Sequence, residues 1–415
     1  VPNDEPAMTP MEIWCNEAQE RYVLAIAPAQ LALFDALCAR ERAPYAVIGT
    51  IDASGRLVVH DRLHGNDVVD MPVDVLLGKP PRMTRDVRTI VPPREPLAAA
   101  ARVTTAAALR AAALSVLEFP AVADKGFLVT IGDRTVGGLV SRDQRVGPWQ
   151  GPVADVAVTL ADYEGHAGEA MAMGERTPVA VLDAPASGRL AVTEAVLNIL
   201  AADVAALGDI RLSANWMAAC GEPGEDAALY ATVRAIGEEL CPALGIAIPV
   251  GKDSLSMRTV WREAGEGGGA GEGRAAGEER SVVAPVSLIV SAFAPLADVR
   301  RTLTPELRRD AGDTRLVHVS LGGARRRLGG SIFAQVHGEL GDDCPDLDDP
   351  QRLVQFAAAM RALRAGGHVL AYHDVSDGGL FATLAEMAFA GHCGLDVRLG
   401  PPAVGAEAAG ASAAG

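Results

Sequence analysis

Apolar residues recur along this chain with two spacings, and the change between them predicts alternating strands and helices. Short runs rich in β-branched residues predict strands at 21–26, 45–51, 56–61, 126–133, 156–160, 245–251, 285–294, 315–321 and 368–374. Helical spacing predicts helices at 28–41, 96–117, 187–207, 225–244, 351–366 and 379–394. Alternation of this kind indicates mixed sheets covered by helices, in an α/β and α+β fold.

The length of 415 residues is enough for two to four domains, each with its own core. A Pro-rich, basic segment at 76–96 is typical of a crossing between domains. The Gly-rich run at 264–279 has no apolar periodicity, which predicts a flexible excursion between two strands. The chain starts without Met and ends in an Ala- and Gly-rich run, so we expect a piece of a longer protein that is incomplete at both ends.

Composition narrows the class of partner. The net charge of −16 repels polyanions, so we expect no nucleic-acid partner, although backbone amides and divalent cations can still neutralise the phosphates of a small molecule. No apolar run is long enough to cross a bilayer and no signal sequence stands at the start, so we expect no membrane partner. The six cysteines lie far apart without a metal-binding pair, which favours a reducing, cytoplasmic location.

The helix expected at 187–207 carries the first candidate site. It is apolar almost all round, which predicts a buried helix, yet it includes Glu194 and Asn198. These two side chains are four residues apart and therefore share one face. A buried carboxylate needs a partner or a metal, and a hard divalent cation would take oxygens from both side chains. An exposed polar stripe, or a Glu194 paired with Arg189 or another Arg, explains the same pattern without a ligand.

A second candidate is the strand, turn and helix expected at 368–381. Asp374 ends the strand and Ser376 lies in the turn, which is where α/β sheets hold ligands. The alternative is structural, because Ser376 or Asp377 would cap the following helix and His373 would be satisfied by backbone groups.

Two loops offer further polar groups. The Pro-rich loop 147–155 brings Asp155 to the start of a strand, although such loops are usually structural. The segment 248–257 resembles a phosphate loop but lacks the Walker A spacing. Its amides around Gly251, with the Ser254 hydroxyl, could hold a phosphate, and a plain turn is the alternative. No Gly-x-Ser-x-Gly elbow is present and Cys220 lacks the setting of a nucleophile, so we expect no glutaminase site.

Eight segments, taken in order, resemble one family. They are PMEIWCNEAQERYVLAI, RERAPYAVIG, DVLLGKPPRMTRDV, TIGDRTVGGLVSRDQRVGPWQGPVADVAV, GEAMAMGERTPVAVLD, LSANWMAACGEPGEDAALY, EELCPALGIAIPVGKDSLSM and AYHDVSDGGLFATLAEMAFAGHCG. They resemble the large single-chain phosphoribosylformylglycinamidine synthases from about Pro10 to Gly394. The Gly-rich run and a Gly/Arg loop at 322–330 are the main interruptions.

The resemblance implies two tandem units, each similar to aminoimidazole ribonucleotide synthetase, followed by a glutaminase domain. Residues 1–95 would be the partial C-terminal domain of the first unit, and 96–295 the N-terminal domain of the second, with the insertion at 264–279. Residues 296–399 would begin the second C-terminal domain, and 400–415 would be a low-complexity tail. The main ATP-binding domain and the glutaminase would be absent, leaving no catalytic residue within the fragment.

The resemblance also implies an activity. The family is an ATP-dependent carbon–nitrogen ligase of purine biosynthesis that uses glutamine as amide donor. It converts formylglycinamide ribonucleotide to formylglycinamidine ribonucleotide, as ATP phosphorylates the amide oxygen and ammonia from the glutaminase displaces that phosphate. The implied cofactors are Mg²⁺ and ATP or ADP, the implied partners are formylglycinamide ribonucleotide and ammonia, and the parent enzyme would be a monomer.

The resemblance assigns site residues position by position. The implied Mg²⁺ ligands are Asp155, Glu194, Asn198 and Asp374. The implied nucleotide contacts are Lys125, Ala154 and Ser376. The implied substrate contacts are Glu17, Gln19 and Ser254. In the large enzymes the corresponding nucleotide site of the second unit is regarded as auxiliary.

Other interpretations remain open. A selenophosphate synthetase or hydrogenase-maturation kinase would share strand-turn-helix nucleotide sites, but neither is expected to carry NEAQERYVLAI beside GPWQGPVAD. A non-enzymatic interpretation makes the chain a nucleotide-stabilised structural domain with no turnover of its own. We expect the fragment to bind nucleotide and to be inactive alone.

Overall fold

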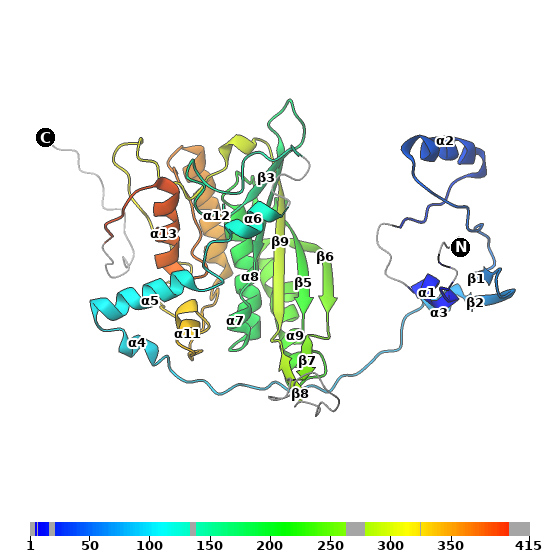
Figure 1. Cartoon of the computed structure of the whole chain (residues 1–415), viewed down its shortest axis with the longest axis horizontal. Helices are drawn as coiled ribbons and strands as arrows, with labels where there is room; N and C mark the ends of the chain where they lie inside the picture. Colours follow the sequence, from blue (N-terminus) through cyan, green and yellow to red (C-terminus); the bar gives the residue numbers. More distant parts are fainter. Residues whose placement is uncertain are drawn as a thin grey trace, which may run out of the picture. The chain divides into compact units, whose positions relative to one another are not determined.

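The computed structural model describes residues 5, 7–15, 21–132, 138–262, 279–323 and 325–397. The chain divides between Arg85 and Asp86 into two compact units, which are described separately below as unit 1 and unit 2. Figure 1 labels their elements.

Unit 1 has a β-hairpin and short helices. Strands β1 (Arg56–Asp61) and β2 (Asn66–Pro72) pair antiparallel. The helical elements are α1 (Pro10–Cys15), η1 (Pro28–Gln30), α2 (Leu31–Glu41) and α3 (Val73–Leu77). No described residue of unit 1 is buried. The strand expected at 56–61 and the helix expected at 28–41 are confirmed. Neither element packs into a buried core in the described part of unit 1.

The strands expected at 21–26 and 45–51 do not form. A strand requires a hydrogen-bonded neighbour, and β1 and β2 are the only paired strands within the described part of unit 1. Apolar residues of the two runs, such as Val23 and Ile51, are exposed instead.

Unit 2 is built on a five-stranded mixed sheet (Figure 1). Its strands are β3 (Ala157–Leu160), β4 (Gly168–Gly174), β5 (Arg211–Met217), β6 (Ala247–Ser254) and β9 (Ser287–Leu296), in the order β3-β4-β9-β5-β6. Only the β5–β6 pair is parallel among the strands described. The structure confirms the strands expected at 156–160, 245–251 and 285–294. It adds β4 and β5, which the apolar pattern does not predict.

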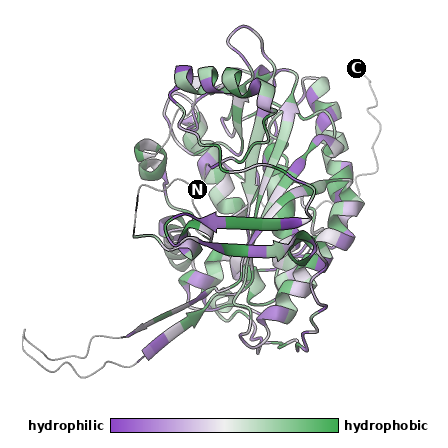
Figure 2. Ribbon diagram, turned by 90° about the vertical axis from the view of Figure 1, so that its right-hand side faces the viewer, coloured by the Kyte–Doolittle hydropathy of each residue, from purple (hydrophilic) through white to green (hydrophobic). Residues whose placement is uncertain are grey.

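Helix α8 (Ala184–Ile199) lies along one face of this sheet. The core between them is lined by small and branched apolar residues, including Val158, Ala172, Leu212, Val290, Val192, Val196 and Ile199. Helices η4 (Ala235–Leu240), α10 (Cys241–Leu244) and α12 (Pro350–Ala365) add residues to this core, and α9 (Glu225–Arg234) packs against α8. The central strands are largely apolar, whereas the helices around them carry both apolar and hydrophilic residues (Figure 2). The mixed sheet covered by helices that the sequence predicts is confirmed.

The helix expected at 187–207 begins and ends earlier than predicted. The Asp183 carboxylate caps its start by accepting the Ala186 amide at 2.9 Å, and the helix ends at Ile199. Beyond it, the guanidinium of Arg364 donates to the carbonyls of Leu200 and Ala201 at 2.9 and 2.8 Å. A distant side chain therefore satisfies the carbonyls that end the helix, which no local sequence signal predicts.

Most of the remaining elements of unit 2 are short, except α5 (Ala106–Glu118) and α13 (Gly379–Gly391). The short ones are α4 (Ala99–Arg102), α6 (Gly126–Ile131), α7 (Thr177–Ala180), η3 (Leu207–Asp209), η5 (Val299–Arg301), α11 (Ile332–Val336) and the strands β7 (Arg258–Arg262) and β8 (Glu279–Val283). Strands β7 and β8 pair into a ribbon that projects from the unit (Figure 2). The Gly-rich excursion expected at 264–279 lies almost wholly outside the described residues, as does the tail at 400–415.

Four secondary-structure predictions in unit 2 are wrong. The helix expected at 96–117 is interrupted at 103–105, where the Thr105 hydroxyl caps α5 by accepting the Ala108 amide at 3.2 Å. The run 126–133 begins as helix α6, because the Leu128 amide bonds back to the Lys125 carbonyl at 2.9 Å. The runs 315–321 and 368–374 are not strands. In the second, the Tyr372 amide donates to the Thr304 carbonyl, so its partner is a loop.

Candidate functional site

Glu194 lies on α8 where the end of β4 meets the helix. A Cβ at Gly174 would lie 2.2 Å from the Ala191 carbonyl oxygen, so only glycine allows the strand to approach so closely. The Glu175 amide that follows donates to the Glu194 carboxylate at 2.8 Å. Arg189 bonds Asp346 through two nitrogens at 2.6 and 2.8 Å, so the ion pair between Glu194 and Arg189 does not form.

Burial governs the charge of Glu194. It raises the pKa of this carboxyl to about 7, although the Glu175 amide and the nearby Arg176 act in the opposite direction. The neighbouring Asp377 and Glu175 add to the increase. A second positive charge beside Glu194 would favour its ionised form.

Asn198 lies one turn further along α8. Its amide nitrogen donates to the Met173 carbonyl at 2.9 Å, which fixes the side chain against the end of β4. Its carbonyl oxygen is buried without a hydrogen-bond partner. A buried unpaired acceptor is costly, so this oxygen is available to a ligand.

Asp155, His373 and Asp374 form a compact cluster. In the antiparallel β3–β4 pair, Ala157 lies opposite Met171. Asp155, two residues before Ala157, therefore lies at the same end of the pair as Met173, which accepts the hydrogen bond from Asn198. The ligand atoms of the three clustered residues all lie within 4.8 Å of one another. The structure thus brings two of the implied Mg²⁺ ligands together, with His373 beside them.

His373 is held by two carboxylates. Its Nδ1 lies 2.7 Å from Asp155 Oδ1, and its Nε2 lies 2.6 Å from Glu386 Oε2. Burial acts to lower the pKa of His373, but the charge of Asp155 and the hydrogen bonds to both carboxylates outweigh it and raise the pKa to about 10. The alternative that backbone groups satisfy this ring is therefore wrong.

Asp374 adds a third carboxylate to this buried group. Burial and the charge of Asp155 raise its pKa well above the usual range, and Glu194 acts in the same direction. Glu194 therefore lies within electrostatic reach of the cluster. All four implied Mg²⁺ ligands gather at one end of the sheet. Glu194 and Asn198 lie on α8, Asp155 precedes β3, and Asp374 lies in the segment before α13.

The unsatisfied atoms at this site fit a hard cation. Asp155 Oδ2 and Asn198 Oδ1 are both buried without a partner, and the Asp155 side chain is only 2% exposed. Carboxylate and amide oxygens are the ligands that Mg²⁺ prefers. A divalent cation would satisfy both orphan oxygens and offset the crowding of carboxylates.

The turn at 375–379 carries the implied nucleotide contact Ser376. Neither Ser376 nor Asp377 caps α13, because no side chain caps that helix and the Ser376 carbonyl accepts the Gly379 amide at 2.9 Å. Asp377 instead forms an ion pair with Arg176. The structural alternative in which Ser376 or Asp377 caps this helix is therefore wrong.

The other implied nucleotide residues lie on neighbouring loops. A Cβ at Gly378 would lie 3.2 Å from the Val122 side chain, so the loop that precedes Lys125 touches this turn. The Lys125 ammonium donates to the Ala123 carbonyl at 2.5 Å. Ala154 is adjacent to Asp155, and its amide donates to the Gln144 carbonyl at 2.9 Å.

Comparison with known proteins identifies two domain families along the chain. The FGAR-AT PurM_N-like domain family matches residues 124–295, and the family of the AIR synthase related protein, C-terminal domain, matches residues 1–62 and 313–413. Together these matches cover most of the chain and all four residues of the oxygen cluster. The chain belongs to the phosphoribosylformylglycinamidine synthase family. The fold is that of the synthetase region of this family.

Solved structures of synthases from Thermotoga maritima are similar in fold. PurL complexed with ATP is 16% identical, with a TM-score of 0.52 over 94% of this chain and 51% of the PurL chain. PurL complexed with ADP is 21% identical, with a TM-score of 0.47 over 74% and 43% of the two chains. Phosphoribosylformylglycinamidine synthase II is 20% identical, with a TM-score of 0.45 over 74% and 42%. The chain thus spans about half the length of the first of these structures.

The implied substrate residues of this synthase-family chain are only partly described. Glu17 and Gln19 lie outside the described residues. Ser254 ends β6, so Gly251 and Lys252 belong to a strand paired with β5, and neither the phosphate loop nor the plain turn forms there. Because β5 and β6 run parallel to β4, Ser254 lies at the same edge of the sheet as Glu175.

Several residues at the site were missed by the sequence analysis. Glu386, Arg176 and Arg142 each face the carboxylates from a different segment. Burial lowers the pKa of Arg142, against the opposing charge of Asp155, and its Nε is buried without a partner. In the sequence, Arg142 is only a basic residue that precedes the Pro-rich loop. Such a pattern is too common to identify a site residue.

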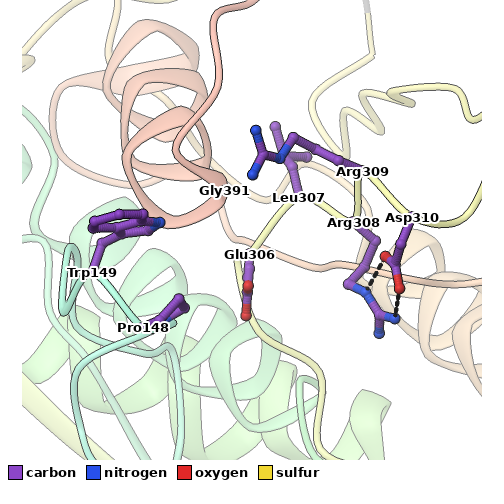
Figure 3. Close-up of a pocket in the computed structure, with 8 residues that line it drawn as sticks. All are labelled: Pro148, Trp149, Glu306, Leu307, Arg308, Arg309, Asp310 and Gly391. Atoms are coloured by element: carbon purple, nitrogen blue, oxygen red, sulfur yellow. Dashed lines mark hydrogen bonds and ion pairs between the residues drawn. The ribbon is translucent and has the colours of Figure 1, made fainter.

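A surface pocket of about 300 Å³ is lined in part by Pro148 and Trp149 of the Pro-rich loop. Figure 3 shows the Trp149 indole and the Glu306 carboxylate at its edge, with Arg308 paired to Asp310. None of its lining residues belongs to the carboxylate cluster.

Among the described residues, no helix has the length and apolar composition that a membrane span requires.

Proposed function

We propose that unit 2 binds Mg²⁺ and an adenine nucleotide at the oxygen cluster, and that the chain acts within the synthetase region of a phosphoribosylformylglycinamidine synthase. The parent reaction would convert formylglycinamide ribonucleotide to formylglycinamidine ribonucleotide with ATP, and with glutamine as the source of ammonia. The observation that carries this proposal is the pair of buried, unpartnered oxygens on Asp155 and Asn198 beside Asp374.

The donor set supports Mg²⁺ as the cation. Asp155, Glu194, Asn198 and Asp374 offer only oxygen atoms, and they come from three segments that converge at one sheet edge. Bound Mg²⁺ would neutralise phosphate charge there. The protein residues hold the oxygens in place: Asn198 through Met173, and Glu194 through the Glu175 amide.

The loops beside the cluster support a nucleotide. Lys125, Ala154 and Ser376 lie on segments adjoining the carboxylates, and T. maritima PurL, whose fold this chain shares, was solved in complex with ATP. The half-buried Arg142 offers a buried Nε–H without a partner close to Asp155, which suits a phosphate oxygen. Lys125 and Arg142 thus add positive charge to the loops beside the carboxylates.

The role of this nucleotide is proposed to be auxiliary. In that role it stabilises the fold, and turnover belongs to a part of the parent enzyme outside this chain. A second candidate is a purely structural, nucleotide-stabilised domain, favoured by the absence of a glutaminase motif from the sequence. Both candidates require binding at the same cluster, and they differ only in whether the parent enzyme needs the site for activity.

Calorimetry of the purified chain tests the proposal. We expect Mg²⁺-dependent binding of ADP or ATP, and little turnover of formylglycinamide ribonucleotide when ammonium replaces glutamine. Glu194→Ala and Asp374→Ala should abolish Mg²⁺-dependent binding. The exposed Glu238→Ala and Asp209→Ala are matched controls that should bind as the unaltered chain does. Unchanged binding in both cluster variants would show that the metal assignment is wrong, and robust turnover would exclude the auxiliary role.

A further inference from the structure

We infer that His373 is a positioning residue, held by Glu386, that turns Asp155 so that one carboxylate oxygen faces the imidazole and the other faces the cation. The inference rests on the proposed Mg²⁺ site and adds to it the residues that orient a ligand. Neither His373 nor Glu386 was assigned such a role by the family resemblance.

The contacts form a chain across three segments of unit 2. Glu386 on α13 contacts the ring at Nε2, at 2.6 Å, and the ring contacts Asp155 through Nδ1, at 2.7 Å. The His373 and Asp155 side chains are 7% and 2% exposed, whereas Glu386 is 32% exposed. The two buried members therefore depend on a partner at the protein surface for their orientation.

The two oxygens of Asp155 have different surroundings. Oδ1 receives the His373 ring and, at 3.4 Å, the Asp374 amide. Oδ2 is buried and has no partner. Without the imidazole, the carboxylate could rotate and give either oxygen to the Asp374 amide, so His373 determines which oxygen remains for the cation.

Helix α13 holds this arrangement at two points on one face. The Thr383 hydroxyl donates to the Asp374 carbonyl at 2.9 Å, and Glu386, three residues later, contacts His373. The adjacent Tyr372 hydroxyl donates to the Leu197 carbonyl of α8 at 2.9 Å. The segment 372–374 does not belong to a strand, and these side-chain contacts fix it together with the bond from the Tyr372 amide to the Thr304 carbonyl.

Direct ligation by His373 is disfavoured by the same geometry. Both ring nitrogens already face carboxylate oxygens, so coordination would break one of these contacts. The remaining donors are oxygens, which suit Mg²⁺. Residues behind the ligands commonly alter metal affinity by 10- to 100-fold when they are replaced.

Mg²⁺ titration of the full chain tests the inference. His373→Ala should weaken Mg²⁺ binding about 10- to 100-fold, and the nearly isosteric Glu386→Gln should weaken it less, in the same direction. In the double variant, Glu386→Gln should add nothing to His373→Ala, because its effect passes through the ring. Glu238→Gln is the exposed control on η4 and should leave the affinity unchanged.

Two further measurements separate this role from simple structural support and from direct ligation. The melting temperature of Glu386→Gln without metal should match that of the unaltered chain, since Glu386 is partly exposed. Co²⁺ affinity should fall in His373→Ala by the same factor as Mg²⁺ affinity, whereas a direct nitrogen ligand would cost Co²⁺ more.

The outcomes distinguish this inference from the proposed function. If the unaltered chain binds Mg²⁺ and Asp155→Asn abolishes binding, while both His373→Ala and Glu386→Gln bind normally, the positioning role is wrong and the Mg²⁺ site stands. Additive losses in the double variant, or a selective loss of Co²⁺, would also overturn the positioning role. No Mg²⁺ binding by the unaltered chain would overturn both.

Discussion

Unit 1 and unit 2 use apolar residues in opposite ways. In unit 2, small residues such as Ala172 and Ala214 are buried between a sheet and its helices, and the carboxylates of the site are anchored to that scaffold. In unit 1, large residues such as Tyr22, Val23 and Ile51 are more than four-fifths exposed. Apolar content alone therefore does not locate a core. A core forms where paired strands bring small side chains under a helix.

The largest difference between the units should appear on truncation of an isoleucine. Ile199 in unit 2 is fully buried beneath the sheet, whereas Ile51 in unit 1 is 87% exposed. Ile199→Ala should lower the free energy of unfolding by about 2–5 kcal/mol through lost burial and a residual cavity. The same change at Ile51 should cost less than about 0.5 kcal/mol. Urea unfolding followed by circular dichroism measures both, and equal losses would contradict the contrast between the units.

The effect of pH on stability should also differ in direction between the two units. Burial raises the pKa of Glu194 to about 7, so between about 4.5 and 7 the unfolded chain binds fewer protons than the folded chain. The contribution of Glu194 to the free energy of unfolding of the Mg²⁺-free protein should therefore fall as the pH rises through this window, by about 3 kcal/mol at about 1.4 kcal/mol per pKa unit. In unit 1, the hydrogen bond from His64 lowers the pKa of the exposed Asp61, which acts in the opposite direction.

Glu194→Gln isolates this contribution. The variant should lose the part of the decline between about pH 4.5 and 7 that Glu194 causes when unfolding is measured without Mg²⁺, whereas the part from Asp374, whose pKa burial also raises, should remain. A second decline should remain, because the raised pKa of His373 gives stability that is present below about 6.5 and is lost as the pH rises through about 10. If the variant kept the full acid-side decline, Glu194 would not be its source.

Much of this scaffold was predictable, and the failures have identifiable causes. Strands β3 and β9 carry β-branched residues and were predicted, whereas β4, with the sequence GEAMAMG, consists of small and flexible residues that become a strand through burial between neighbours. The end of α8 depends on Arg364, more than 160 residues away. Long-range partners of this kind leave no periodic trace in the sequence.

The site shows the same division between local and distant information. Spacing alone placed Glu194 and Asn198 on one face, but it left a structural alternative open for each of them. The family resemblance selected Asp155 and Asp374 together with them, because it compares distant segments at once. His373 was misjudged because its partners, Asp155 and Glu386, are 218 and 13 residues away.

Glycine packing provides a smaller test of the comparison. Gly174→Ala would place a methyl group 2.2 Å from the Ala191 carbonyl oxygen and should cost about 1–3 kcal/mol as β4 moves away from α8. It should also weaken Mg²⁺ binding, because the Glu175 amide holds Glu194. Gly49→Ala in unit 1 meets nothing within 4 Å and should stabilise by about 0.4–1 kcal/mol. Thermal unfolding and Mg²⁺ titration of the two variants measure these effects, and a loss of stability at Gly49 would show packing that unit 1 otherwise lacks.

The smallest expected effect concerns one ion pair in each unit. Arg56 and Asp70 pair across the exposed hairpin of unit 1 at 2.7 Å, where solvent and salt screen the attraction. Asp70→Asn should therefore cost about 0.2–1 kcal/mol, and the cost should shrink further in high salt. Arg189 and Asp346 of unit 2 form two hydrogen bonds in a less exposed setting, so Asp346→Asn should cost more and respond less to salt. Denaturant unfolding at low and high salt measures both losses. Equal losses with equal salt dependence would mean that the scaffold of unit 2 does not shield its charges better than the hairpin of unit 1.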